Sequence, residues 1–161
     1  MAGLLIVYHS RTGGSRQMAE ATLATAETEV EAMLKTADET GPDDLLAAAG
    51  YVFCAPENLA ALSGAMKEFF DRCYYPALGG IEGRPYAQMI CAGSDGSSAA
   101  RQIARIATGW RLREVQPPLI VCTHAQRPED ILAPKTIPDD QLARCRDLGA
   151  AIGAGLGMGI F

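Results

Sequence analysis

The chain has 161 residues, a length typical of one domain built around one hydrophobic core. Hydrophobic residues make up 48% of it and charged residues 20%, and no apolar run approaches the ~18 residues that a membrane-spanning helix needs. With 14 Lys and Arg against 19 Asp and Glu, the formal charge of -5 disfavours a general nucleic-acid-binding protein. We therefore expect a single domain over residues 1–161, with no membrane or nucleic-acid partner and with small molecules or proteins as ligands.

The chain starts directly on an apolar run without the basic segment of a secretory or transit signal, so the expected location is cytoplasmic. Its cysteines are odd in number and have no C-x-x-C spacing, which favours reduced thiols over a disulfide framework or a zinc site. They are Cys54, Cys73, Cys91, Cys122 and Cys145. We expect no metal site.

The first predicted elements are a strand, a polar loop and a helix. The apolar run LLIVY at residues 4–8 predicts a buried strand, and HSRTGGS follows it at residues 9–15. This loop packs three hydroxyls, an arginine and two adjacent glycines into seven residues. A helix is expected to begin near Ser15. Its inward side chains are expected to be Ala19, Leu23 and Ala26.

The next predicted elements are two strands and an amphipathic helix. Val30 to Leu34 is a weak strand candidate whose polar flanks suit a sheet edge, and Tyr51 to Ala55 reads as a buried strand. The segment LSGAMKEFFDRC then has apolar residues at spacings of three and four, which predicts a helix with one apolar stripe. That stripe comprises Leu62, Ala65, Met66, Phe69, Phe70 and Cys73.

Two more strands and two helices complete the predicted elements. Tyr86 to Ala92 and Leu119 to Cys122 predict buried strands, and Ser97 to Thr108 predicts a helix that stops at Gly109. The last helix is expected to start at Pro138, a good first-turn residue. Its inward residues are expected to be Leu142, Cys145, Leu148 and Ile152. The alternating glycines after it suit either a closely packed helix end or a loose terminus: Gly153, Gly155, Gly157 and Gly159.

Strands that alternate with helices imply an α/β fold with a doubly wound, five-stranded parallel sheet and helices on both faces. We expect the strand order 2-1-3-4-5, in which ligands bind beyond the carboxyl ends of the first and third strands. Three loops rich in Gly, Ser, Asn and Asp meet there: residues 9–15, 56–64 and 92–97.

The sequence of the first loop suits a phosphate group that is bound without undergoing phosphoryl transfer. It lacks the lysine of a Walker loop and the G-x-G-x-x-G dinucleotide fingerprint, and neither Cys54 nor Cys91 is followed six positions later by the arginine of a phosphatase loop. Backbone N–H groups freed by Gly13 and Gly14 at a helix N-terminus suit a phosphate. The alternative is an ordinary strand-to-helix turn capped by Ser15.

SRTGGS resembles the Ser/Thr-x-Thr-Gly-x-Ser/Thr phosphate loop of the flavodoxin superfamily, and the order of elements matches over essentially the whole chain. APENLAALSGAMKEFFDRCYYP resembles the PENxxxxSGxxKxFFDRxYYP segment of small flavodoxin-like NAD(P)H-dependent FMN oxidoreductases, and AGSDGS occupies the place of their glycine-rich loop. The resemblance implies a flavodoxin-like fold that binds FMN.

Carried over residue by residue, the resemblance implies an FMN site on all three loops. Around the phosphate it places Ser10, Arg11, Thr12, Gly13, Gly14 and Ser15. Along the isoalloxazine it places Pro56, Glu57, Asn58, Leu59, Gly93, Asp95 and Gly96. Relatives commonly have aromatic residues after PEN, whereas this chain has Leu59, Ala60 and Ala61. Loss of ring stacking is worth ~0.5–1.5 kcal/mol, so we expect flavin affinity to fall by up to about tenfold.

The resemblance implies an oxidoreductase that takes hydride from NADH or NADPH and reduces a small-molecule acceptor such as a quinone, a nitro compound or free flavin. The flavin carries the chemistry, so no catalytic side chain is expected. The alternatives are a flavodoxin-type carrier of single electrons and a flavin-free descendant with an interaction role. Relatives of this kind are often dimers, which makes a homodimer possible.

Several conspicuous side chains have both a functional and a structural interpretation. For His9 and His124 we favour partly exposed loop histidines over catalytic groups, and for Glu57 a solvated carboxylate over a proton relay. The cysteines near the strand ends are expected to be packing groups. Tyr74, Tyr75 and Trp110 could line a partner surface or form a packed corner.

Overall fold

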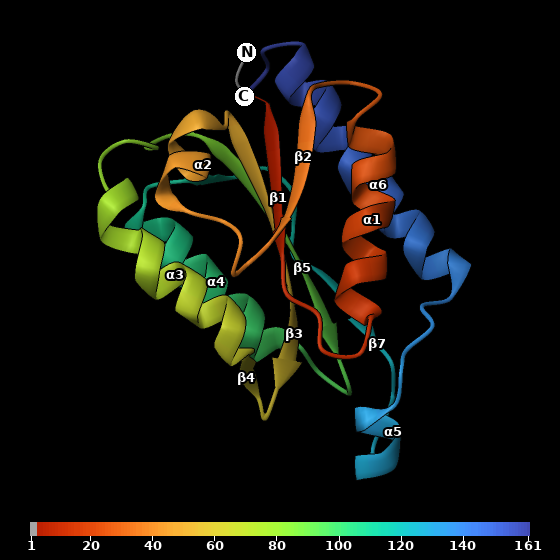
Figure 1. Ribbon diagram of the computed structural model, residues 1–161. Coiled ribbons are helices and arrows are strands. Elements are labelled where there is room, and N and C mark those ends of the chain that lie inside the picture. The colour runs from red at the N-terminus through yellow and green to blue at the C-terminus, as the bar shows by residue number, and fades with distance from the viewer. Residues whose placement is uncertain (1–2) are drawn as a thin grey trace.

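The structure is a computed structural model that describes residues 3–161. Strands form its centre and helices cover both faces (Figure 1). The longer strands are β1 (Leu4–Tyr8), β2 (Ala32–Thr36), β3 (Gly50–Asn58), β5 (Pro85–Ala92) and β7 (Leu119–Cys122). Two-residue strands are β4 (Ala61–Leu62) and β6 (Arg113–Glu114). The helices are α1 (Gly14–Ala26), α2 (Pro42–Ala47), α3 (Gly64–Ala77), α4 (Ser97–Gly109), α5 (Pro128–Leu132) and α6 (Asp139–Gly157).

The sheet has the expected doubly wound topology. β1 pairs in parallel with β2 on one side and β3 on the other, and β3 pairs in parallel with β5. Both β6 and β7 pair with β5, at the start and at the end of that strand, so they act as one interrupted edge strand. The predicted order 2-1-3-4-5 is therefore confirmed as β2-β1-β3-β5-β7, with β4 added as an antiparallel hairpin partner of β3.

Alternate residues of the strands feed two cores, one on each face of the sheet. Leu5 and Val7 of β1 belong to the core that α2, α3 and α4 cover, whereas Leu4 and Ile6 belong to the core under α1 and α6. Figure 1 shows these two sets of helices on opposite faces of the sheet. All four side chains are at most 3% exposed. Strands buried on both faces explain the near-continuous apolar runs that predicted them.

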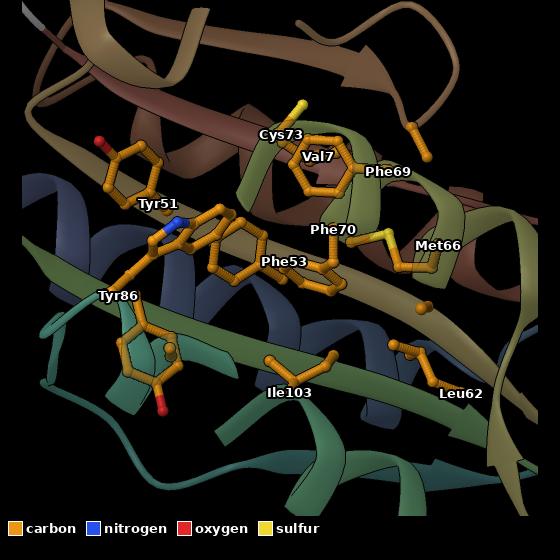
Figure 2. Close-up of a cluster of buried hydrophobic side chains, with 14 of the residues drawn as sticks. Val7, Tyr51, Phe53, Leu62, Met66, Phe69, Phe70, Cys73, Tyr86 and Ile103 are labelled. Atoms are coloured by element: carbon orange, nitrogen blue, oxygen red, sulfur yellow. The ribbon is translucent and has the colours of Figure 1, made fainter. Parts of the chain in front are cut away.

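Phe53 of β3 lies at the centre of the first core (Figure 2). Its ring centroid is 5.2 Å from that of Phe70 and 5.9 Å from that of Tyr51. Trp110, fully buried, stacks on Tyr74 at 5.5 Å and donates from Nε1 to the Tyr74 carbonyl. The Tyr74–Trp110 pair is thus a packed corner.

Helices α1 and α6 touch at their backbones in the second core. Thr22 Oγ1 donates to the Cys145 carbonyl at 3.2 Å, and Thr25 Oγ1 donates to the Arg146 carbonyl at 2.7 Å. A Cβ at Gly149 would overlap the Thr22 carbonyl oxygen, and Gly153 packs on Ala26 in the same way one turn later. The glycines of α6 therefore form a closely packed helix face, which decides between the two interpretations of the tail up to Gly157.

Some predicted boundaries were wrong. β2 begins at Ala32, because Val30 still donates its N–H to the Ala26 carbonyl in the turn that ends α1. Ala65 is exposed, because it lies one residue off the inward row of α3 that starts at Met66. The chain reverses after α4 at Arg111, whose φ is 60°, and not at Gly109, which is helical.

Two glycines offer a matched test of the α1–α6 contact. Gly149→Ala should lower the free energy of unfolding by ~2 kcal/mol, because a methyl group forced into a packed backbone contact outweighs the helix-propensity gain of ~1 kcal/mol. Gly64→Ala, which has open space at the first turn of α3, should leave stability unchanged or slightly raised. Urea denaturation of both variants measures the difference, and equal stabilities would contradict the close contact.

Candidate functional site

The loop between β1 and α1 is fixed by the side chain of Gln17. Gln17 Nε2 donates to the Gly13 carbonyl at 3.0 Å and to the Lys135 carbonyl at 2.7 Å, while its Oε1 accepts the Ile137 N–H at 2.9 Å. The Lys135 N–H donates to the Thr12 carbonyl at 2.8 Å. One glutamine therefore ties the loop to the segment between α5 and α6.

The same loop leaves its donors at the start of α1 unpaired. Within residues 3–161, the N–H groups of Gly14, Ser15 and Arg16 have no hydrogen-bond partner. Ser15 is 2% exposed and its hydroxyl also lacks a partner in that part of the chain. Gly13 takes a left-handed φ of 97°, and a Cβ at Gly14 would lie 2.6 Å from the Cys91 sulfur, so both positions need glycine. Free donors at a helix N-terminus form an anion site, and this one fits a phosphate.

An open pocket of about 500 Å³ lies against the loop. Ser10, Arg11, Thr12 and Gly13 line it, as do side chains that the sequence did not single out. These are Tyr8, Arg16, Thr36 and Asp38, together with Leu132 and Pro134 beside α5. The residues expected along the isoalloxazine do not line this pocket: they lie at the end of β3, in the turn between β3 and β4, and on the loop after β5.

The second loop is a strained β-hairpin. Asn58 of β3 pairs with Ala61 of β4, and the two residues between them have left-handed φ values, 52° at Leu59 and 60° at Ala60. Asn-Gly is the usual sequence for such a turn, because glycine and asparagine tolerate this region whereas most other residues lose ~1–2 kcal/mol each there. The Leu59 side chain, in the turn between the paired residues Asn58 and Ala61, is fully exposed and has no packing partner among the described residues. The hairpin of β3 and β4 is seen in the lower part of Figure 1.

Glu57 joins the second loop to the third. Its Oε1 accepts the Gly96 N–H at 2.9 Å and its Oε2 accepts the Ala99 N–H at 3.0 Å, so the carboxylate caps the N-terminus of α4. A carboxylate at a helix N-terminus is favoured by the helix dipole. The interpretation of Glu57 as a solvated carboxylate was wrong, and with both oxygens occupied the side chain is not arranged as a proton relay.

The third loop is shaped by Asp95, Gly93 and Gly96. Asp95 Oδ1 accepts the Ser97 N–H at 3.2 Å, and hydrogen bonding to Ser97 lowers the pKa of this exposed carboxyl group. Gly96 has a left-handed φ of 86°, and the Gly93 carbonyl accepts the His124 N–H at 2.8 Å. All three loops leave the sheet at the same edge, because they follow the carboxyl ends of the parallel strands β1, β3 and β5.

His9 is held against the start of α3. Its Nδ1 lies 2.9 Å from the hydroxyl of Ser63, which is buried and is the N-cap residue of the helix. Burial lowers the pKa of His9, Asp38 opposes this shift and Arg11 adds to it. His124 is exposed, with a left-handed φ of 62°.

The cysteines near the strand ends are packing groups, as expected. Cys54 is fully buried and its thiol donates to the Ser15 carbonyl at 3.4 Å, which places it directly beneath the start of α1. Burial raises the pKa of Cys91 and of Cys145 to about 11, so both remain protonated thiols. Among residues 3–161 no group of three or more His, Cys, Asp or Glu side chains could hold a metal ion. No helix in that range is long and apolar enough to cross a membrane.

Comparison with known proteins identifies the family and the fold. The family described as NADPH-dependent FMN reductase matches residues 42–126, more than half of the chain. A protein named flavodoxin from Aquifex aeolicus (strain VF5) is 35% identical over 86 residues, a stretch that covers 52% of this chain and 46% of that protein. The matched region thus spans about half the length of this curated relative.

Solved structures match over nearly the full length. A flavodoxin from the domain Archaea has a TM-score of 0.78 at 19% identity, covering 97% of this chain and 99% of its own. A flavodoxin, WrbA-like protein from Agrobacterium tumefaciens has a TM-score of 0.71 at 21% identity, covering 99% of both chains. The flavodoxin-like fold implied by the resemblance is confirmed.

The strain in the hairpin turn can be measured. Ala60→Gly should raise the free energy of unfolding by ~0.5–1 kcal/mol, because relief of the left-handed strain exceeds the added entropy of the unfolded chain. Ala61→Gly, at the next position in β4, should lower it by ~0.5–1 kcal/mol, because no such strain is relieved there. Thermal unfolding reports both, and a loss of stability in Ala60→Gly would contradict the strain.

The lowered pKa of His9 predicts a pH dependence of stability. The unfolded chain protonates His9 near its ordinary pKa of 6.5, whereas the folded state resists protonation. The contribution of neutral His9 is therefore complete above that pH and is lost as the pH falls from 6.5 toward the folded pKa. Urea denaturation between about pH 7.5 and pH 5.5 should show a steeper acid loss in the wild type than in His9→Asn. Parallel curves for the two proteins would refute this assignment.

Proposed function

Because the chain belongs to the NADPH-dependent FMN reductase family, we propose that it is an FMN-dependent oxidoreductase. It takes hydride from NADH or NADPH and reduces a small acceptor such as a quinone, a nitro compound or free flavin. The observation that carries the proposal is the buried, unpartnered hydroxyl of Ser15 beside three free N–H groups at the start of α1. Such donors are costly to leave unpaired, and a phosphate satisfies them.

The first loop holds the phosphate of FMN in this proposal. The N–H groups of Gly14, Ser15 and Arg16 and the Ser15 hydroxyl donate to its oxygens, and the hydroxyls of Ser10 and Thr12 add to them. Ser10 Oγ already accepts the Gly13 N–H at 3.0 Å, which leaves its own proton for the ligand. Gly13 and Gly14 allow the close approach of the backbone, and Arg11 supplies a positive charge at the rim.

The second and third loops border the ring. Pro56, Asn58 and Leu59 lie on the hairpin side, and Gly93, Asp95 and Gly96 on the other side. Glu57 is a positioning residue, because its two hydrogen bonds to α4 set the spacing of the loops. Bound FMN supplies the hydride transfer, and the chain itself binds and orients the ring without a catalytic nucleophile.

The hairpin tip leaves the ring open to substrate. Relatives with aromatic residues here would stack on the flavin, whereas Leu59, Ala60 and Ala61 offer small aliphatic groups. Ala60 is exposed and Ala61 half-buried, so neither covers the site edge with bulk. This arrangement supports a site that admits a small acceptor over one that seals the flavin.

A second candidate function is that of a single-electron carrier. It is favoured by the protein named flavodoxin from Aquifex aeolicus, which is 35% identical over the 86 matched residues. A carrier docks on protein partners through a concentrated charged patch. Arg72 donates to the carbonyls of Ala37 and Thr40 beyond the carboxyl end of β2, so a positive charge lies at the edge of the sheet where a carrier would need an acidic patch. Arg84 lies at the opposite edge, just before β5, where it donates to the Ala48 carbonyl. We therefore rank the carrier second.

Flavin titration tests the proposal. Measured by the quenching of flavin fluorescence, FMN should bind with higher affinity than riboflavin. Ser15→Ala should weaken FMN binding by ~10- to 100-fold, because hydrogen bonds to charged groups are worth ~1.5–3 kcal/mol. Riboflavin affinity should stay the same in Ser15→Ala, which serves as the internal control. Steady-state turnover of the FMN-loaded protein with NADH or NADPH and a panel of acceptors then separates a reductase from a carrier. Equal affinities for FMN and riboflavin would overturn the phosphate site.

A further inference from the structure

We propose that the pocket beside the phosphate loop is a subsite for an adenosine phosphate group, the half of an adenine dinucleotide that lies away from the reacting ring. The inference rests on the proposed function, because it extends the same site. The pocket is about 500 Å³ in volume, within the ~300–1,000 Å³ range of small-molecule sites and larger than a single phosphate needs. Its outer walls come from the end of β2 and from the segment after α5.

Asp38 gives the pocket its chemical selectivity. It follows the carboxyl end of β2, and the Ala37 N–H donates to the Tyr8 carbonyl at 2.8 Å, so this acidic residue is fixed beside the end of β1. A carboxylate repels a phosphate, yet it suits the hydroxyls of a ribose, which donate to it. An acidic residue after the second strand, facing a glycine-rich loop after the first, is the arrangement that binds the ribose diol in dinucleotide-binding folds.

The loop that carries Asp38 is anchored from α3. Arg72 Nη2 donates to the Ala37 carbonyl at 2.9 Å and its Nη1 donates to the Thr40 carbonyl at 2.7 Å, on either side of Asp38. Thr40 Oγ1 donates to the Thr36 carbonyl at 2.7 Å. Asp38 itself forms no ion pair in the described part of the chain. The backbone on both sides of Asp38 is therefore fixed, and its exposed carboxylate has, within residues 3–161, no ion pair that a ligand would need to break.

Two arginines and an apolar wall complete the subsite. Arg11 and Arg16 line the pocket, are exposed and form no ion pair within residues 3–161, so they can balance a phosphate. Leu132, 56% exposed, and Pro134 offer an apolar surface for a planar base. Lys135 Nζ holds this wall by donating to the carbonyls of Asp130, Ile131 and Ala133 at 2.7–2.9 Å.

Calorimetric titration of the full chain with AMP tests the subsite. AMP should bind the wild type, and Asp38→Asn should weaken it by about tenfold or more, because the diol loses a charged acceptor. Glu39→Gln, the neighbouring exposed acidic residue outside the pocket, should leave AMP affinity unchanged. The 2′,3′-dideoxy analogue of AMP should bind the wild type as weakly as AMP binds Asp38→Asn. An absence of AMP binding, or equal affinities in the wild type and Asp38→Asn, would overturn the proposal.

The same titration on FMN-loaded protein distinguishes the source of the adenosine group. If FMN leaves AMP binding intact, the group belongs to the nicotinamide donor. If FMN excludes AMP while FAD binds more tightly than FMN in an Asp38-dependent way, it belongs to the flavin. Exclusion of AMP without that FAD preference overturns the subsite. FMN affinity, measured separately, should be equal in the wild type and Asp38→Asn. If the proposed function is wrong, FMN does not bind; if only the subsite is wrong, FMN still binds.

Discussion

The loop after β1 keeps a fixed shape while the N–H groups of Gly14, Ser15 and Arg16 stay unpaired within residues 3–161, and the side chain of Gln17 makes this possible. Its amide nitrogen donates to the carbonyls of Gly13 and Lys135, and its amide oxygen accepts the N–H of Ile137, so one side chain joins the loop to the segment before α6. The loop therefore does not need to consume its own donors to be rigid. Preorganised donors lose little entropy when an anion arrives, which is the physical basis of phosphate affinity in such loops.

The other two loops are joined by the carboxylate of Glu57. Both carboxylate oxygens of Glu57 accept N–H groups at the N-terminus of α4, so this acidic group positions the two loops and is not available to a ligand. The hairpin it belongs to closes through two left-handed residues that are not glycine. Strain of this kind persists only where the surroundings determine the backbone, and here the β3–β4 pairing and the Glu57 contacts do so.

The fold could be predicted from the sequence far better than the contacts of the site. β1 and β7 have the predicted bounds, because uniformly apolar runs mark strands buried on both faces. Short elements such as α2, α5 and β4 were missed, because a few residues show no periodicity. The Gln17–Lys135 contact joins positions 118 apart, which no local pattern reveals. Asp38 was overlooked because the edge strand before it was placed two residues too early and ended at Leu34, short of Thr36.

The exposed tip at Leu59 has a consequence for how this site changes over evolutionary time. The left-handed backbone at that position costs a similar amount for most side chains that are unbranched at Cβ, less for Asn or Asp and more for β-branched residues, and the leucine side chain has no packing partner in residues 3–161. Many substitutions at Leu59 are therefore expected to change the free energy of unfolding only slightly. If the hairpin tip borders the substrate, as we propose, its exposed side chain can change among residues that tolerate this backbone with little loss of stability, so new substrate preferences can arise here.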